Sequence, residues 1–221
     1  MSRTTALMSV LTGDEKHTAA ATSTLDVVRV LYERVLKVSP ETAGDPARDR
    51  FLLSKGHGPM AYYAVLAEQG FFPEEWLEGW GGYDSPLGFH PDRNLVPGVE
   101  IGSGSLGHGL PLGVGTALGL RAQGISSRVV VLVGDAELDE GSNHEALELA
   151  AALRLDALTV VVVDNRSSSY AVPGRIAQRF ATEDWHTATV DGRDPDALER
   201  ALTHREPGRP NVVVAVVEEK S

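Results

Sequence analysis

The stretch Arg128–Ser169, RVVVLVGDAELDEGSNHEALELAAALRLDALTVVVVDNRSSS, predicts the fold of this chain. Its two apolar runs, Val129–Val133 and Val160–Val163, lack the polar–apolar alternation of a half-exposed strand, and a helical segment separates them. Continuous apolar strands joined through a helix are typical of a parallel sheet that is covered on both faces. We therefore expect an α/β fold with a mostly parallel central sheet and helices on both faces.

Each apolar run ends in polar residues, Asp135 after the first and Asp164-Asn165 after the second. In a βαβ unit both strands point the same way, so their carboxyl ends lie at one edge of the sheet, where open α/β sheets bind ligands. Asp135 and Asn165 are therefore expected at a common edge. Their oxygens suit a hard cation such as Mg²⁺, which keeps open positions for phosphate oxygens.

The composition excludes several classes of function. The 221 residues suffice for one α/β domain, and a formal net charge of −11 without a Lys/Arg cluster argues against a nucleic-acid partner. The chain has no cysteine, which excludes disulfides, thiolate metal sites and cysteine nucleophiles. No apolar run is long enough to span a membrane, and the N-terminus is a poor signal peptide. We expect a cytoplasmic protein without a membrane partner.

The other segments predict further elements of the same fold. Residues 1–14 have no clear periodicity and are expected to form a loose arm, followed by a helix from about Thr24 to Val38. Ser142-x-x-Glu145 is a capping box that predicts a helix start near residue 142. The remaining expected elements are strands at Phe51–Leu53, Thr187–Val190 and Val212–Val217, and helices over 59–69, 73–80 and 195–203 and before Gly124.

Two glycine-rich segments carry candidate binding residues. His57 stands between Gly56 and Gly58 at a strand-to-helix turn, which presents its ring and lets the backbone come close to a ligand. Residues 98–109, GVEIGSGSLGHG, follow a GFHPD segment that contains His90. Neither pattern is specific by itself. A plain turn histidine is the alternative for His57, and a surface histidine is the alternative for His17, which precedes the first expected helix.

Three blocks of sequence resemble the N-terminal, diphosphate-binding half of transketolases. Gly134-Asp135-x(4)-Glu140-Gly141, with Asp164-Asn165 further on, is similar to the thiamine diphosphate motif, a GDG followed at a distance by Asn. Residues 49–57, DRFLLSKGH, and 97–107, PGVEIGSGSLG, are closer to transketolase in particular. The resemblance covers the chain from about His17 to Val217. It implies the thiamine-diphosphate-binding fold, with residues 1–221 as a single diphosphate-binding domain.

The resemblance also implies roles for individual residues. The metal ligands would be Asp135, the side chain of Asn165 and the carbonyl of Ser167, holding Mg²⁺ (or Ca²⁺ or Mn²⁺) against the diphosphate of thiamine diphosphate. The cofactor would be lined by His57, Gly104, Ser105, Leu106, Gly134 and Ala136, and the catalytic candidates are His57, His90 and His17. Glu140 would be an acid just outside the residues that contact the cofactor, and it would help link the two cofactor sites of the assembly. Alternatively, Glu140 only favours the N-terminus of the following helix.

The family's activating glutamate belongs to a pyrimidine-binding domain, for which 221 residues leave no room. The resemblance therefore implies a split enzyme, completed by a C-terminal transketolase-like subunit that carries this domain, in an α₂β₂ assembly. The leading reaction is transfer of a two-carbon ketol unit between sugar phosphates. We expect Ile101, Leu106 and Leu110 to form an apolar surface that the partner covers.

Two other functions stay open. The turn Gly134–Asp139, GDAELD, is also similar to bacterial pyruvate dehydrogenase E1. An enzyme of that type would pass the two-carbon unit to a carrier thiol or to an intermediate of specialised metabolism. A non-catalytic, truncated paralogue is the second alternative. Ala136, in place of the second Gly of GDG, favours it, whereas the presence of Asp135, Asn165, His57 and His90 opposes it.

Overall fold

The structure is a computed structural model that describes residues 2–11, 15–56, 58–169 and 172–218, with the backbone alone for residues 15–20. In chain order its elements are α1 (Arg3–Val10), α2 (Glu15–Val30), the π-helical turn η1 (Leu31–Val35), β1 (Arg50–Leu53), α3 (Pro59–Glu68), the 3₁₀ turn η2 (Glu74–Gly79), α4 (Gly109–Ala122), β2 (Val129–Gly134), the 3₁₀ turn η3 (Ala136–Asp139), α5 (Gly141–Ala152), β3 (Leu158–Asp164), α6 (Arg175–Thr182), β4 (His186–Asp191), α7 (Pro195–Thr203) and β5 (Asn211–Val216).

The strands of the described chain form one sheet in the order β1-β2-β3-β5-β4, and every neighbouring pair is parallel. The parallel α/β fold predicted from the apolar runs is therefore confirmed. β2 is buried along its whole length, and β3 is buried up to Val163. Because both faces of these strands are covered, their sequences need no polar alternation.

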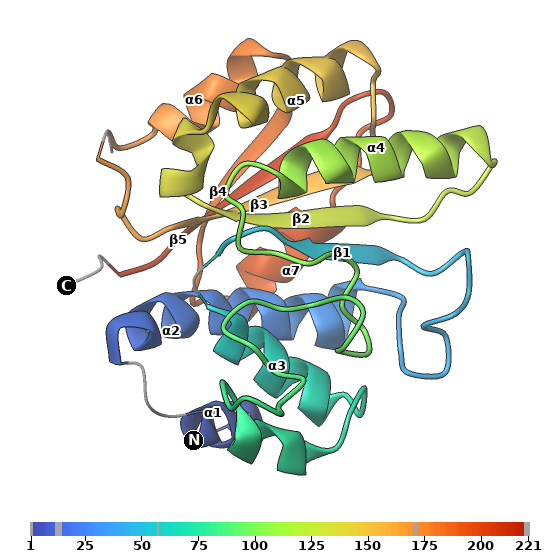
Figure 1. Ribbon diagram of the computed structural model, residues 1–221. Coiled ribbons are helices and arrows are strands. Elements are labelled where there is room, and N and C mark those ends of the chain that lie inside the picture. Colours follow the sequence, from blue (N-terminus) through green and yellow to red (C-terminus); the bar gives the residue numbers. More distant parts are fainter. Residues whose placement is uncertain (1, 12–14, 57, 170–171, 219–221) are drawn as a thin grey trace.

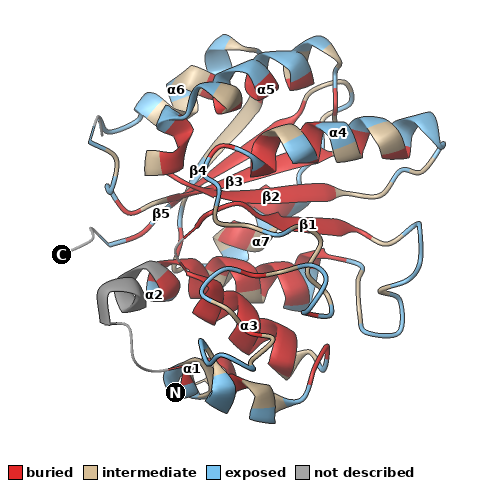
Figure 2. Ribbon diagram, viewed as in Figure 1, coloured by how far each residue is buried: buried red, intermediate tan, exposed pale blue. Residues whose placement is uncertain are grey.

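Helices form a layer on each face of the sheet: α4, α5 and α6 lie on one face, and α2, α3 and α7 on the other (Figure 1). Successive strand residues divide between these layers, as the pleat of a strand requires. Phe51, Val130 and Val161 pack in the α2–α3 layer, whereas Leu52, Val131 and Val160 pack in the α4–α5 layer. Figure 2 shows the central strands buried throughout; α4, α5 and α6 expose their outer faces, whereas α3 is buried along nearly all of its length.

The N-terminal region differs from the prediction. Part of the segment expected to be a loose arm forms α1, whose N-cap Ser2 accepts a hydrogen bond from the Thr5 N–H at 3.2 Å. Thr4 and Leu11 are buried, and α1 contacts α3. The helix expected from Thr24 begins at Glu15 and passes into η1 after Val30. Helix α1 escaped prediction because its sequence has no apolar periodicity and its stability depends on contacts with distant residues.

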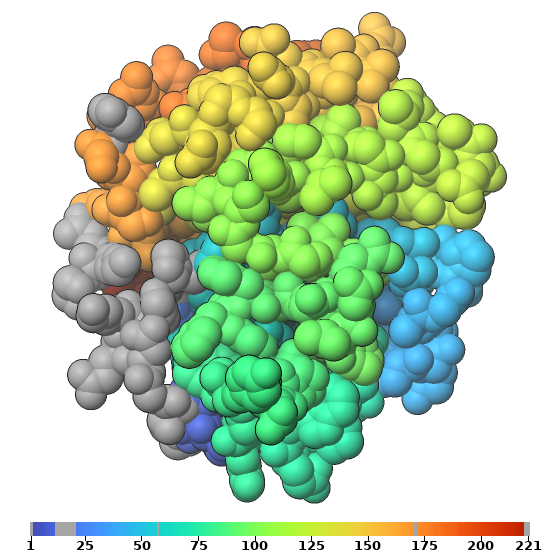
Figure 3. Space-filling view, viewed as in Figure 1, coloured from blue at the N-terminus to red at the C-terminus, as the bar shows by residue number. Residues whose placement is uncertain are grey.

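The long segment between η2 and α4, residues 80–108, has no regular secondary structure. Figure 3 shows it in green across the centre of one face of the molecule. Its Tyr83, Phe89 and Leu95 are among the exposed large apolar side chains. Within the described residues, no helix has the length and apolar character needed to cross a membrane.

Candidate active site

The carboxyl ends of β2 and β3 bring Asp135 and Asn165 to one edge of the sheet. Gly134, the last residue of β2, is paired with Val163 of β3, and the Asp135 N–H donates a hydrogen bond to the Val163 carbonyl at 3.2 Å. Asp135 and Asn165 are each 3% exposed. The structure therefore places both residues where the strand pattern predicted them.

The carboxylate of Asp135 also accepts hydrogen bonds from the turn that follows Asn165. Its Oδ2 accepts from the backbone N–H of Ser167 at 2.6 Å and from that of Ser168 at 3.1 Å, and its Oδ1 accepts from the Ser167 hydroxyl. Ser167 thus contacts Asp135 through its donor groups, whereas the resemblance assigns the metal to its carbonyl. These bonds fix the turn against the end of β2.

Asn165 presents a buried acceptor without a hydrogen-bond partner in the described part of the chain, its Oδ1 atom. A buried acceptor left unpaired costs on the order of 1–3 kcal/mol, so such atoms need an explanation. An amide oxygen beside a carboxylate, at the ligand-binding edge of an α/β sheet, matches the oxygen ligands of a hard cation. The residues present therefore fit a metal that is coordinated partly by phosphate.

Beside Asp135 lies a cavity of about 270 Å³ with a lining of mixed charge. Its charged residues are Asp135, Asp139, Asp164, Arg166, Arg175 and Arg179. Arg179 donates to the carbonyl of Leu138 at 2.8 Å, and the Ser168 hydroxyl donates to Asp139 at 2.9 Å. These bonds tie α6 and the turn after β3 to η3. Helix α6, which contributes two of the three arginines, was not predicted from the sequence.

The glycine-rich loop, residues 98–109, contacts the GFHPD segment that contains His90. The Ser103 N–H donates to the carbonyl of Pro91 at 3.1 Å, and the ring of His90 lies against Gly104. Gly104 has φ +111°, and a β-carbon there would be 2.8 Å from Cγ of the His90 ring. Only glycine therefore meets both the backbone conformation and the space at this position.

The same loop reaches the strand-to-helix turn after β1. The methyl group Cδ2 of Leu106 would be 3.2 Å from a β-carbon at Gly56, and Gly58 is the N-cap residue of α3. His57, between these two glycines, lies outside the described residues, and so does the side chain of His17 on α2. The structure thus brings together Gly56, His90, Gly104 and Leu106, and the roles of His57 and His17 stay predictions.

The predicted apolar surface of the loop is only partly present. Leu106 is 40% exposed, but Leu110 is fully buried as the second residue of α4. Ile101 is half-buried and packs against the core on the α4 side of the sheet. The expectation that all three side chains are exposed was therefore wrong for Leu110, because the helix begins earlier than the glycines suggested.

Glu137 is a buried acid of this site that sequence reasoning missed. It is 2% exposed, and its carboxylate accepts hydrogen bonds from the Ser54 hydroxyl and from the N–H groups of Gly107 and Gly134. Burial raises the pKa of Glu137, while these hydrogen bonds and nearby Lys55 act to lower it. Nothing in the acidic run GDAELDE distinguished Glu137 from its exposed neighbours, since its partners lie far away in the sequence.

Glu140 and Ser142 both contact Gly107. Glu140 is exposed and occupies the N-cap of α5 without a capping hydrogen bond from its side chain. A β-carbon at Gly107 would be 2.7 Å from Cβ of Glu140 and from Oγ of Ser142. The Ser142 hydroxyl donates to the carbonyl of Gly107 at 2.7 Å. The capping box predicted from Ser142 is therefore wrong, because this side chain holds the glycine-rich loop.

The residues predicted to line the cofactor differ in exposure. Gly134 is buried, and a β-carbon there would be 3.4 Å from Cγ of Lys55, whose side chain is also buried. Ala136 and Gly104 are half-buried, whereas Ser105 is exposed. Together with Leu106 they lie on three segments, the end of β2, η3 and the glycine-rich loop. This distribution suits a ligand that sits above the sheet edge.

Known proteins resemble this chain in sequence and fold. The family described as "Transketolase, thiamine diphosphate binding domain" matches residues 1–217. Ferredoxin fas2 of Rhodococcoides fascians is 52% identical over 217 residues, which cover 98% of this chain and 71% of that protein. One of the subunits of the apulose-4-phosphate transketolase of Actinobacillus succinogenes is 37% identical over 209 residues, which cover 90% of this chain and 75% of that protein.

A solved structure agrees with these sequence matches. Transketolase from Leishmania mexicana superposes with a TM-score of 0.78 and 25% sequence identity, covering 98% of this chain. This chain spans 37% of the length of that enzyme. The match over residues 1–217 and the relatives above 30% identity lead to one conclusion: the chain belongs to the transketolase family and has the fold of its thiamine diphosphate-binding domain.

Proposed function

We propose that this chain is the diphosphate- and Mg²⁺-binding subunit of a two-component transketolase-like enzyme of the cytoplasm, which transfers a two-carbon ketol unit between sugar phosphates. The observation that carries the proposal is the buried Oδ1 of Asn165, which has no partner in the described chain and stands at the same sheet edge as the carboxylate of Asp135. This pair sits in a domain whose family binds thiamine diphosphate.

The metal would be held by Asp135, by Oδ1 of Asn165 and by the carbonyl of Ser167. Mg²⁺ is the favoured ion, since it binds through few protein oxygens and completes its shell with phosphate oxygens and water; Ca²⁺ and Mn²⁺ use similar ligands. The hydrogen bonds from Ser167 to Asp135 already hold the turn beside the carboxylate.

Thiamine diphosphate, when bound, supplies the carbanion-stabilising chemistry by which a ketose can be cleaved and its two-carbon unit passed on. The protein's own contribution is binding and orientation. Gly104, Ser105, Leu106, Gly134 and Ala136 would line the cofactor, with Glu140 behind it. His57 would contact the cofactor, and His90 and His17 would donate hydrogen bonds to substrate oxygens as charge develops on them.

The partner would be a second subunit that carries the pyrimidine-binding domain, in an α₂β₂ complex. Relatives that are named as single subunits of transketolases support this proposal, among them 6-deoxy-6-sulfo-D-fructose transketolase subunit SqwG of Clostridium sp., 33% identical over 90% of this chain. The exposed Leu106, next to the cofactor-lining glycines, is one apolar side chain that such a partner would cover.

Co-purification from the native host, followed by an assay of the complex, tests the proposal. The complex is expected to transfer a ketol unit from ketose phosphates to aldose phosphates only when thiamine diphosphate and Mg²⁺ are both present. His90→Ala is expected to lower turnover by roughly 10²–10⁴ with cofactor binding largely kept. Full transfer activity of this chain without a second protein would contradict the two-component proposal. Cofactor binding without transfer between sugar phosphates would indicate a different acceptor.

A further inference from the structure

We infer that Glu137 is a positioning residue of this site: its carboxylate fixes the glycine-rich loop to the ends of β1 and β2 and so sets the shape that receives the cofactor. The inference rests on the proposed function for the cofactor, but the contacts of Glu137 stand independently of it. Glu137 is not among the ligands that the family resemblance implies, and nothing in its sequence position indicated a role.

The carboxylate joins three segments that are far apart in the sequence. Oε1 accepts from the Gly107 N–H at 3.0 Å and from the Ser54 hydroxyl, and Oε2 accepts from the Gly134 N–H at 3.3 Å. Ser54 follows β1, Gly107 belongs to the glycine-rich loop, and Gly134 ends β2. One buried side chain thus joins the end of β1, the glycine-rich loop and the end of β2, where Asp135 stands.

Ser54 extends this connection to the start of α4. Its Oγ accepts a hydrogen bond from the Gly109 N–H at 3.0 Å while its proton is donated to Glu137. A β-carbon at Gly109 would be 2.1 Å from Cβ of Ser54, so the two backbones approach as closely as glycine allows. Gly107 and Gly109 are therefore both held through Glu137, one directly and one through Ser54.

The partners of the Glu137 carboxylate in the described chain are donors, which specifies a carboxylate and disfavours an amide. A glutamine of the same shape has one acceptor oxygen and one NH₂ group, so its NH₂ would have to face an N–H or O–H donor. Loss of a hydrogen bond to a buried charged group weakens the contact by roughly tenfold to a hundredfold. In Glu137→Gln the remaining oxygen can still accept from Ser54 and Gly107, so this change should release Gly134 alone. Glu137→Met, which has a similar length and no oxygen acceptor, should release all three donors.

Release of Gly107 should reach the residues proposed to line the cofactor. Gly104, Ser105 and Leu106 immediately precede Gly107, whose carbonyl also accepts a hydrogen bond from the Ser142 hydroxyl at 2.7 Å. With the Glu137 bond gone, the loop would pivot on Ser142 and His90. Cofactor affinity should then fall because the loop must be ordered again on binding.

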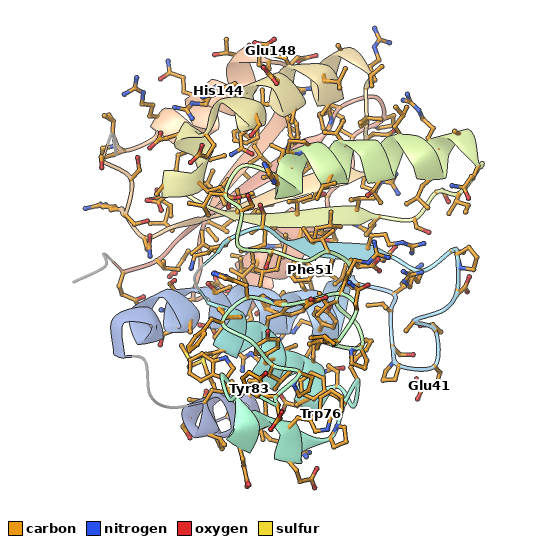
Figure 4. All side chains as sticks on the ribbon, in the orientation of Figure 1. Glu41, Phe51, Trp76, Tyr83, His144 and Glu148 are labelled. Atoms are coloured by element: carbon orange, nitrogen blue, oxygen red, sulfur yellow. The ribbon has the colours of Figure 1, made fainter. Side chains whose placement is uncertain are left out.

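The test compares the full chain carrying Glu137→Met with the wild type and with Glu148→Met as a matched control. Glu148 is an exposed residue of α5 on the outer side of the molecule, far from the loop (Figure 4). Amide hydrogen exchange, followed residue by residue by NMR without cofactor, reports the loop directly. Thiamine diphosphate affinity is then measured by calorimetry with Mg²⁺ and the partner subunit present.

For Glu137→Met we expect amide exchange at Gly107 and Gly134 to rise on the order of tenfold or more, with exchange in the core strands unchanged. Cofactor affinity should fall by a similar factor, with turnover at saturating cofactor largely kept. Ser54→Ala, a milder change, should raise exchange at Gly109 and give a smaller loss of affinity. The control should match the wild type in every measurement.

Three results would overturn the inference. The first is unchanged exchange at Gly107, Gly109 and Gly134 in both variants. The second is faster exchange in the loop with unchanged cofactor affinity, and the third is a uniform loss of protection across β2 and β3, which would indicate a role in global stability. If the wild-type complex binds no thiamine diphosphate, the proposed function fails. The exchange experiment still tests whether Glu137 holds the loop.

Discussion

Arg48 and Glu100 form a two-pronged ion pair that ties the start of the glycine-rich loop to the segment before β1. Nε of Arg48 lies 2.9 Å from Oε1 of Glu100, and one terminal nitrogen lies 3.0 Å from Oε2. Both side chains are about four-fifths buried, with 19% and 20% exposure. The loop is thus held at both ends, by Glu100 at its start and by Ser54 and Glu137 near its close.

Glu100→Gln should loosen the start of this loop. The change removes the charge and one prong of the pair, so we expect a loss of about 1–2 kcal/mol in the free energy of unfolding, measured by urea denaturation. Glu75→Gln, at an exposed position of η2, is the control and should change stability by less than about 0.5 kcal/mol. Equal stability of the two variants would mean that solvent already screens the Arg48–Glu100 pair.

Gly104→Ala should destabilise the chain and weaken cofactor binding. The new methyl group meets the His90 ring at 2.8 Å, and a φ of +111° is unfavourable for alanine, so a loss of about 1–3 kcal/mol is expected. Gly115→Ala on α4 is the matched control, since a β-carbon there meets nothing within 4 Å. In the isolated chain it should stabilise by about 0.5–1 kcal/mol, because alanine favours a helix. A stable Gly104→Ala variant would contradict the close contact with His90.

Asn165→Ala should weaken cofactor binding without lowering the stability of the chain. The wild-type side chain buries an acceptor without a partner in the described chain, so its removal should cost the isolated chain little or no stability by thermal unfolding. The same variant should lose Mg²⁺-dependent binding of thiamine diphosphate. A large loss of stability without cofactor would show that Asn165 has a structural role and would weaken the metal assignment.

Arg193 should control the titration of Glu218 and help hold α2. Its Nε lies 3.0 Å from Glu218, and a terminal nitrogen lies 2.9 Å both from Asp26 and from the carbonyl of Thr22. The hydrogen bond from Arg193 lowers the pKa of Glu218. A depressed folded-state pKa contributes stability above the ordinary Glu pKa and loses it as the pH falls through the folded value.

Arg193→Met should therefore return the pKa of Glu218 toward its ordinary value in an NMR titration of the side-chain carboxyl. The variant should be less stable than the wild type near neutral pH, and the difference should shrink in acid, where Glu218 is protonated in both proteins. A pKa that stays low in the variant would assign the shift to another group.

The sequence predicted the sheet and the position of Asp135 and Asn165 at one edge of it, because both depend on local patterns. Val129–Val133 and Val160–Val163 are apolar without alternation, which only a strand covered on both faces requires. Asp194-Pro195 predicted the start of α7, and Asp194 does accept from the N–H groups of Asp196 and Ala197. In each case the residues that form the element also carry its pattern.

Hydrogen bonds between residues far apart in the chain could not be predicted from the sequence. Ser142 has the spacing of a capping box, yet its hydroxyl bonds to Gly107, 35 residues earlier in the chain. Glu137 looks like one acid among several, but its partner Ser54 stands 83 residues before it. The hydrogen-bond partner of such a side chain depends on which groups the tertiary structure leaves unpaired. Local patterns in a single sequence do not show this.

The most direct test of the account is calorimetric titration of thiamine diphosphate into the complex of the full chain with its partner subunit. With Mg²⁺ present, the wild-type complex should bind the cofactor saturably, and chelation by EDTA should abolish the binding. Asp135→Ala should weaken binding by roughly a hundredfold or more, since the metal loses its only proposed carboxylate ligand. Equal affinity of the wild-type and Asp135→Ala complexes, with or without Mg²⁺, would contradict the assignment of this sheet edge as the metal and diphosphate site.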